Sequence, residues 1–231
     1  MAAAGALVLC QDMGHTYGRG TTAVVAVHGL SCAVHRGDRI AITGPSGSGK
    51  STLLFLLAGL ERPTSGSIEW PAFAGTPLGR PRSAGMVYQG LSLIPALSVV
   101  ENVGLPLVLA GTGDDEARDI AVSALRTLGI EWLADKLPDG LSGGQSQRVA
   151  IARVLAAAPE LILADEPTGQ LDHETGAQVV QALLDAADSV GAALVVSTHD
   201  TSVARRLDVE WRLVDGALAA SQGISREGVR R

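Results

Sequence analysis

The stretch GPSGSGKST, from Gly44 to Thr52, limits the fold of this chain more than any other feature of the sequence. It follows the apolar segment IAIT, which we expect to be a short buried strand, and it leads into KSTLLFLLA, which we expect to be a helix. It matches the pattern G-x-x-x-x-G-K-[ST], in which glycines let the backbone curl until several N–H groups face an anion. The sequence therefore predicts a phosphate-binding loop between a strand and a helix.

The chemistry of this loop suits a nucleoside triphosphate. Lys50 can reach the β- and γ-phosphates, the hydroxyl of Ser51 can ligate Mg²⁺, and the start of the helix adds its positive end. The alternative is a Gly/Ser-rich turn with an unrelated lysine. The candidate phosphate-binding residues are Gly44, Pro45, Ser46, Gly47, Ser48, Gly49, Lys50, Ser51 and Thr52.

A second candidate site follows the apolar segment LILADEP. Asp165 and Glu166 end an expected buried strand, and ligands of parallel sheets bind at the carboxyl ends of strands. Asp165 could hold Mg²⁺, and Glu166 could act as the general base on a water molecule, which indicates hydrolysis. The alternative is a pair of surface carboxylates.

Expected strands and helices alternate in the last third of the chain, as they do around the loop. This pattern predicts an α/β fold with a mainly parallel sheet. We expect helices over 50–58, closed by Gly59, over 114–128, with Asp114 as the N-cap, over 143–158 and over 173–189, and a short helix over 204–207. The helical region from about residue 91 to 159 looks inserted.

Composition narrows the class of protein. The net charge of −6 argues against nucleic acid as the main partner. Cys10 and Cys32 have no metal or redox spacing, and we interpret them as two buried thiols in a reducing compartment. The apolar start of the chain is interpreted as a first strand, and the segment VVENVGLPLVLAG is too short to cross a bilayer.

The segment LSGGQSQRVAIARVLAAAPELILADEPTGQLD resembles the ATP-binding cassette (ABC) family of ATPases. The resemblance implies a P-loop NTPase core of RecA-like fold, an N-terminal antiparallel β subdomain and an inserted helical subdomain. It implies one ABC ATPase domain over 1–231, with the ATP-binding core in 1–89 and 160–231 and the helical signature subdomain in 90–159. The implied cofactors are ATP and Mg²⁺.

The resemblance also assigns roles to single residues. Tyr17 would stack on adenine, Gln89 would touch Mg²⁺ and report the state of the nucleotide, and His199 would face the γ-phosphate. Tyr17 could instead be a core aromatic, and His199 a hydrogen-bonded histidine at a strand end. The signature would comprise Ser142, Gly143, Gly144 and Gln145, followed by Asp172.

The signature has a physical rationale as a second anion site. Ser142 is expected to cap the helix that follows it, and the two glycines would leave the first amides of that helix uncovered. Family architecture implies that this site meets the γ-phosphate bound to another chain. The expected partner is a second copy or a related ABC subunit, with two ATP molecules between the two chains.

The finer resemblance is to the branch that contains macrolide exporters (MacB), lipoprotein-releasing ATPases (LolD) and the cell-division ATPase FtsE. It implies a subunit at the cytoplasmic face of the inner membrane that drives a separate permease with an FtsX/MacB-like fold. An exporter or extractor is the leading hypothesis. A regulatory ATPase of the FtsE kind and a cassette protein of DNA repair or translation are the alternatives.

One apolar cluster between the expected core and the helices remains to be assigned. Leu91, Leu93, Ile94 and Leu97 are too apolar for a solvated loop. They could line an exposed groove for a short helix of the membrane subunit, or they could fill the core of the helical region.

Overall fold

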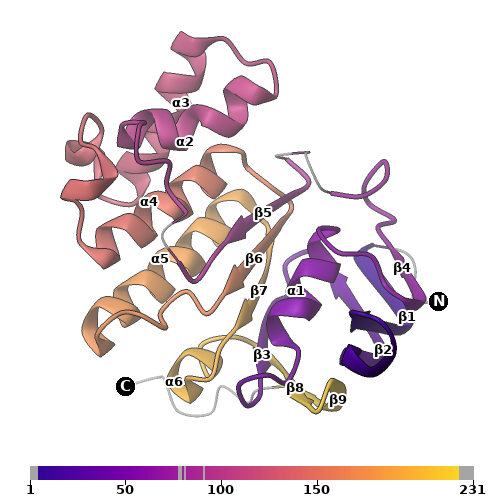
Figure 1. Ribbon diagram of the computed structural model, residues 1–231. Coiled ribbons are helices and arrows are strands. Elements are labelled where there is room, and N and C mark those ends of the chain that lie inside the picture. Colours follow the sequence, from indigo (N-terminus) through magenta and orange to yellow (C-terminus); the bar gives the residue numbers. More distant parts are fainter. Residues whose placement is uncertain (1–4, 78–79, 81, 91, 224–231) are drawn as a thin grey trace. The chain divides into compact units, whose positions relative to one another are not determined.

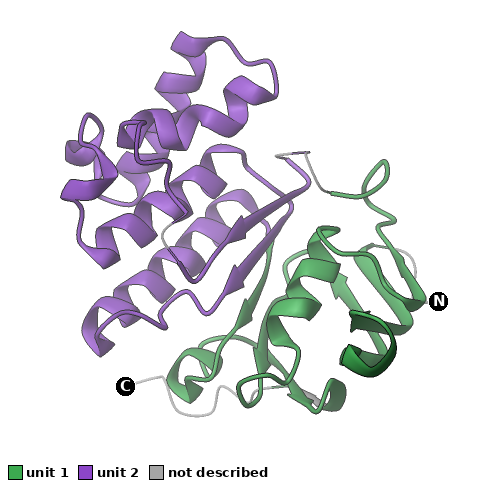
Figure 2. Cartoon of the chain, viewed as in Figure 1, with its two compact units in different colours: residues 1–78, 193–231 green, residues 79–192 purple. Residues whose placement is uncertain are grey.

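The computed structural model describes residues 5–77, 80, 82–90 and 92–223. The chain divides into two compact units, which are coloured separately in Figure 2: unit 1 comprises residues 1–78 and 193–231, and unit 2 comprises residues 79–192. Strands and helices alternate along the chain (Figure 1), so the predicted α/β class is confirmed. The subdomain boundaries expected near residues 89 and 160 stay a prediction.

Unit 1 contains the antiparallel sheet expected at the N-terminus. Strand β1 (Ala6–Tyr17) pairs on one side with β2 (Val24–His35) and on the other with β4 (Ser65–Glu69). Cys10 and Cys32 lie opposite each other on β1 and β2 as free thiols. Cys10 is buried as predicted, but Cys32 is only half-buried, so the prediction of two buried thiols is half wrong. A hydrogen bond with Cys10 and burial together raise the pKa of the Cys32 thiol.

A second sheet in unit 1 is mainly parallel. Its central strand β3 is parallel to β7 on one side and to β8 on the other, and β9 is antiparallel to β8. Burial on both faces explains the apolar sequence of β3, in which Ile40 and Ile42 are almost fully buried. The strands are β3 (Arg39–Thr43), β7 (Ala193–Ser197), β8 (Val209–Val214) and β9 (Ala217–Gly223).

The helices of unit 1 are short. Helix α1 (Lys50–Ala58) has the predicted bounds, and Gly59 ends it in the left-handed conformation with φ of 74°. Helix α6 covers Thr201–Ala204, so the prediction over 204–207 is wrong. It starts earlier because the side chain of Asp200 accepts a hydrogen bond from the Ser202 amide and caps it there. A 3₁₀ turn, η1, covers Gly20–Thr22.

Unit 2 is built around a parallel pair of strands and four helices. Helix α4 packs on β5 and on its neighbours α2, α3 and α5, which gives the unit an apolar centre. The elements are β5 (Ala84–Val87), α2 (Val99–Leu109), α3 (Asp114–Thr127), α4 (Gly143–Ala156), β6 (Leu161–Asp165) and α5 (His173–Val190), with 3₁₀ turns η2 (Glu131–Leu133) and η3 (Pro138–Gly140).

The start of α3 differs from the prediction by one residue. Gly113 is the N-cap, with extended backbone angles, and its carbonyl accepts the first helical hydrogen bond, from Ala117. Asp114 is instead the first residue of the helix, so its assignment as the cap is wrong. Its carboxylate still lies in the first turn, where the helix dipole favours negative charge.

Helix α2 is anchored at its start by side chains. Ser98 and Glu101 form a capping box, in which each side chain bonds the other residue's backbone amide. This contact with Ser98 lowers the pKa of Glu101. Within the described part of the chain, no helix is both long and apolar enough to cross a membrane.

Candidate functional site

The phosphate-binding loop of unit 1 has the predicted setting, between β3 and α1. Gly49 is the N-cap of α1 with φ of 96°, and no side chain caps the first amides of this helix. Only glycine fits here, because a Cβ on Gly49 would clash with the carbonyl oxygen of Ala26. The first turn of α1 therefore presents N–H groups that an anion can accept.

Lys50 lies inside the curl of this loop. Its side chain is buried, and Nζ donates hydrogen bonds of 3.0 and 3.1 Å to the carbonyl oxygens of Gly44 and Pro45. The neighbouring Ser48 hydroxyl is buried without a hydrogen-bond partner in the structure. A buried cation and an unsatisfied hydroxyl in one curled loop suit a phosphate group, which would satisfy both.

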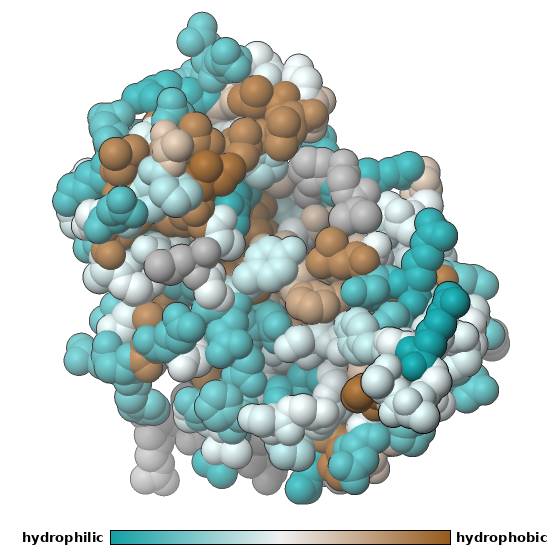
Figure 3. Space-filling model, in the orientation of Figure 1, coloured by the Kyte–Doolittle hydropathy of each residue, from teal (hydrophilic) through white to brown (hydrophobic). Residues whose placement is uncertain are grey.

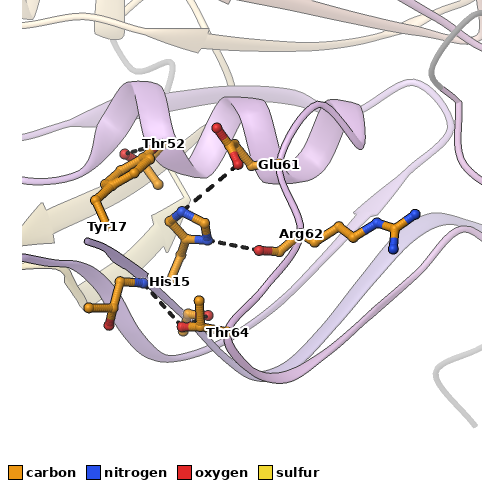
Figure 4. A network of polar contacts seen from close by, with 8 residues as sticks. His15, Tyr17, Thr52, Glu61, Arg62 and Thr64 are labelled. Atoms are coloured by element: carbon orange, nitrogen blue, oxygen red, sulfur yellow. Dashed lines mark hydrogen bonds and ion pairs between the residues drawn. The ribbon is translucent and has the colours of Figure 1, made fainter. Parts of the chain in front are cut away.

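Tyr17 lies beside the start of α1. Its hydroxyl is 3.5 Å from Oγ1 of Thr52, two residues beyond Lys50 (Figure 4). The residue remains partly exposed, at 39%. An exposed aromatic ring next to a phosphate-binding loop can stack on a base whose phosphates occupy the loop. The alternative of a buried core aromatic is wrong.

His199 follows β7 in the same unit and is exposed. The two residues beside it are fixed locally, because the Asp200 amide donates a hydrogen bond of 3.0 Å to the Thr198 hydroxyl. The strand therefore places His199 at its carboxyl end. Its role at a γ-phosphate stays a prediction.

The acidic pair lies at the end of a buried strand, as the sequence predicted, and this strand belongs to unit 2. Asp165 is the last residue of β6 and is buried, and Glu166 follows it directly. Glu166 has a φ of 44°, which is unusual for a residue with a side chain and costs free energy. Strain of this kind clusters at functional sites and supports the choice of Glu166 as a candidate base.

Gln89 lies in the same unit as the acidic pair and near it. A Cβ on Gly169 would lie 3.1 Å from Nε2 of Gln89 and 3.7 Å from Cβ of Glu166, so both side chains border this glycine. Unit 2 thus brings together Gln89 and Glu166, which are far apart in the sequence. The phosphate loop, Tyr17 and His199 belong to unit 1.

The signature begins with a capped helix, as predicted for Ser142. Its hydroxyl accepts a hydrogen bond of 3.3 Å from the Gln145 amide, and Oε1 of Gln145 accepts one of 3.0 Å from the Ser142 amide. The expectation that the first amides are left uncovered is therefore wrong for Gln145. The Ser142 hydroxyl accepts in this capping box, so its own hydrogen can still be donated to an anion.

The glycines of the signature are explained by packing within unit 2. A Cβ on Gly144 would clash with the side chain of Thr175 on α5, and one on Gly143 would lie 3.2 Å from Leu171. Asp172 is the N-cap of α5 and accepts a hydrogen bond of 3.0 Å from the Thr175 amide. This contact lowers the pKa of Asp172. Two helix starts, those of α4 and α5, thus lie against each other.

Two residues of α4 that the sequence reasoning missed bind the segment after β5. Gln147 donates a hydrogen bond to the Tyr88 carbonyl, at 3.2 Å. Arg153 donates to the carbonyl and hydroxyl oxygens of Ser92, at 2.8 and 2.7 Å, and burial lowers the pKa of its guanidinium. The segment around Gln89 is therefore attached to the helix that begins with the signature.

The fold and these sites agree with a match to a family model. A model described as ABC transporter matches residues 27–169. The chain belongs to the ABC transporter family, as an ATP-binding component that hydrolyses ATP.

Curated relatives match over almost the whole chain. The lipoprotein-releasing system ATP-binding protein LolD of Pseudomonas fluorescens is 41% identical over 222 residues, which cover 93% of this chain and 98% of LolD. LolD of Legionella pneumophila is 41% identical over 223 residues, 94% of this chain and 98% of the relative.

Solved structures of similar fold include two of the ATP-binding cassette MJ0796. One is described as a dimeric bacterial ABC transporter cassette, with a TM-score of 0.85, and the other as a dimeric post-hydrolysis state bound to ADP and Pi, with a TM-score of 0.84. Each is 36% identical to this chain, and each match covers 94% of this chain and 99% of the MJ0796 chain. CbiO1 from Clostridium perfringens, part of the transporter complex cbiONQ, is 30% identical with a TM-score of 0.82, over 95% of this chain and 89% of that one.

Proposed function

We propose that this chain is the ATP-hydrolysing subunit of a membrane complex that extracts a lipoprotein or a similarly lipid-anchored cargo. The observation that carries the proposal is the identity of 41% to LolD proteins over 93% of the chain. The chain would work at the cytoplasmic face of the inner membrane and would be held there by a separate permease with an FtsX/MacB-like fold.

The phosphates of ATP would be bound by unit 1. Lys50 would leave the carbonyl oxygens of Gly44 and Pro45 and turn to the β- and γ-phosphates, while Ser48 would donate its hydroxyl hydrogen. Ser51 of unit 1 and Gln89 and Asp165 of unit 2 each carry an oxygen atom that would serve as a ligand of Mg²⁺. When bound, it would neutralise charge that develops on the phosphates.

Hydrolysis would depend on a carboxylate base. Glu166 would accept a proton from the attacking water, and its strained backbone would hold the carboxylate in one direction. His199 would donate a hydrogen bond to the γ-phosphate. Tyr17 would stack on the adenine base.

Two copies of the chain would close over two ATP molecules. The dimeric state described for MJ0796 supports this arrangement. Ser142 and the amides of Gly143 and Gly144 would face the γ-phosphate bound to the other copy, and Asp172 would lie at the same interface. Hydrolysis would then loosen the pair.

A cavity of about 370 Å³ in unit 2 is the proposed docking site for the membrane subunit. It lies between α2 and α3, where apolar surface gathers in Figure 3, and its apolar lining includes Leu97, Leu105 and Val108. Of the apolar cluster singled out in the sequence, Leu97 and Ile94 reach the surface, Leu93 is buried in the unit, and Leu91 lies outside the described residues.

The rim of this cavity is mostly acidic. Glu101, Asp114 and Asp115 line it, and the one lining cation among the described residues, Arg118, is paired at 3.1 Å with Asp135. A short helix with an apolar face and Lys or Arg at its ends would match both features. Helix α4 is bonded to Tyr88 and Ser92. Through these bonds, movement of the docked helix would be transmitted to Gln89 and to the signature.

The proposed extraction is tested by reconstituting the chain with its membrane subunit in vesicles. ATP should then release a lipoprotein to an acceptor, and Lys50→Ala should abolish release. ATP turnover that activates an enzyme on the outer face, without release of lipoprotein, would replace extraction by the regulatory function.

The proposed dimer is tested with Ser142→Arg. A bulky cation at the interface should block ATP-dependent dimerisation in sedimentation and leave ATP binding by a single chain intact. Loss of binding by the single chain would place Ser142 in its own nucleotide site. Ser142→Ala, which loses only the cap, controls for damage to α4.

The docking surface is tested with Val108→Ser, which changes the lining of the cavity. Stimulation of ATP hydrolysis by the membrane subunit should fall, while hydrolysis by the chain alone stays unchanged. Leu109→Ser is the matched control, because Leu109 is 78% exposed and does not line the cavity. Equal stimulation in the two variants would contradict docking at this site.

A further inference from the structure

His15 is a buried polar residue that the proposed chemistry does not use. Only 6% of it is exposed, and it lies on β1 two residues before Tyr17. The two rings meet edge to face, with centroids 4.5 Å apart and planes at 75° (Figure 4). Aromatic pairs prefer this geometry, in which the positive edge of one ring meets the negative face of the other.

The orientation of the His15 ring is fixed by a hydrogen bond from outside its strand. Nδ1 lies 2.8 Å from the carbonyl oxygen of Arg62. A carbonyl oxygen only accepts, so Nδ1 carries the hydrogen and donates it. Nε2 lies 4.0 Å from a carboxylate oxygen of Glu61, a long contact that pairs the two groups when the ring is protonated. The segment that follows α1 therefore sets the plane of the ring.

Tyr17 is held between this ring and the phosphate-binding helix. Its hydroxyl approaches the Thr52 hydroxyl at 3.5 Å, which is a weak hydrogen bond by distance, so the edge-to-face contact with His15 is a second restraint on the Tyr17 ring. Tyr17 is otherwise partly exposed, at 39%. Its orientation thus depends on His15 as well as on α1.

We propose that His15 is the positioning residue for the base of the bound nucleotide, because it fixes the Tyr17 ring beside the start of α1. The inference rests on the proposed function, in which Tyr17 stacks on adenine. An edge-to-face contact contributes about 2- to 10-fold to an equilibrium constant, so the loss of His15 reduces base binding by that factor. The phosphate loop has its own contacts and does not depend on His15.

The experiment measures equilibrium binding of two probes to the purified full chain. ADP carries both base and phosphates, whereas inorganic tripolyphosphate occupies only the phosphate loop. Fluorescence of ethenoadenosine diphosphate reports stacking directly, since stacking on an aromatic ring quenches the modified base. Free energies of unfolding are measured in urea for each variant.

Two replacements of His15 separate positioning from mere structural support. His15→Asn keeps a side-chain N–H for the Arg62 carbonyl but has no ring for Tyr17, whereas His15→Phe keeps a ring edge and loses the N–H. Asparagine should therefore retain more stability and phenylalanine more ADP affinity. This opposite order is the expected result, with tripolyphosphate affinity within about twofold of the original chain in both variants and quenching weaker in His15→Asn than in His15→Phe.

Tyr17→Ala supplies the reference. It should weaken ADP binding by about 5- to 100-fold, as for loss of one base stack, and adding His15→Asn to it should weaken binding no further. The inference would be overturned if the His15 variant with the higher free energy of unfolding also had the higher ADP affinity. It would also be overturned if the double variant bound ADP more weakly than Tyr17→Ala does. Unchanged ADP affinity in Tyr17→Ala would also overturn it and would leave the phosphate site standing. Failure of the original chain to bind tripolyphosphate or ADP would overturn the proposed function itself.

Discussion

Replacing Asn102 by alanine should lower the free energy of unfolding by about 3 kcal/mol, because this one side chain attaches α2 to the segment before it. The Asn102 side chain is fully buried. Oδ1 accepts a hydrogen bond from the Ile94 amide at 2.7 Å, and Nδ2 faces the carbonyl oxygens of Ile94, Leu97 and Ser98 at 2.9–3.1 Å.

The magnitude follows from the number of bonds that the amide can make. Oδ1 accepts one of them, and the two hydrogens on Nδ2 supply two full bonds shared among three carbonyl groups. At about 0.5–1.5 kcal/mol for each bond, the loss is about 1.5–4.5 kcal/mol. A loss of 3 kcal/mol corresponds to about 6–12 °C in melting temperature for a chain of this size.

The assay is urea unfolding followed by circular dichroism. Ser123→Ala, on the exposed side of α3, is the control and should stay within about 0.5 kcal/mol of the original chain. Asn102→Asp has nearly the same shape but replaces the donor by a carboxylate that faces three carbonyl groups, so it should destabilise more than alanine does. An aspartate variant that is more stable than the alanine variant would refute the reasoning from these bonds.

Three further predictions concern the phosphate loop and the two helix starts in unit 2. Lys50→Ala should abolish tight ATP binding and hydrolysis in calorimetry and phosphate-release assays, because the γ-phosphate loses its cation; near-original values would contradict the loop assignment. Gly144→Ala should destabilise the chain by about 1–3 kcal/mol in urea, since the new Cβ clashes with the methyl group of Thr175, and Thr175→Ser should recover most of this loss; a loss unaffected by serine would argue against the clash. Asp172→Asn should make the free energy of unfolding fall less steeply as the pH is lowered. The Asp172 pKa is lowered on folding, so the contribution of this carboxylate to the free energy of unfolding is present above the unfolded pKa of about 3.9 and is lost as the pH falls through the lower folded pKa. A free energy of unfolding that falls as steeply with acid as in the original chain would contradict this.

Local patterns explain what the sequence predicted well. The bounds of α1 follow from the loop glycines before it and Gly59 after it, and the cap at Ser142 follows from its side chain. A similar signal was available and missed in SVVE, where Ser98 and Glu101 form the capping box that starts α2. Asp114 shows the limit of such patterns, because glycine and aspartate both suit an N-cap and only the backbone angles decide between them.

The features that the sequence could not predict depend on partners far along the chain. His15 bonds a carbonyl 47 residues away, and Arg153 bonds Ser92 over 61 residues. Neither side chain belongs to a local pattern, so burial and bonding partners were visible only in the folded chain. The positive φ of Glu166 is likewise a property of the folded backbone that no local sequence pattern indicated.

The most direct test of the central claim is ATP turnover and oligomeric state in Glu166→Gln. Glutamine keeps the shape of the side chain but is a poor base, so hydrolysis should fall by about 10²–10⁴-fold. Removing two carboxylates beside two γ-phosphates also relieves repulsion, so gel filtration with ATP and Mg²⁺ should show a stable dimer. A variant that hydrolyses ATP at the original rate, or that stays monomeric with ATP bound, would contradict the account.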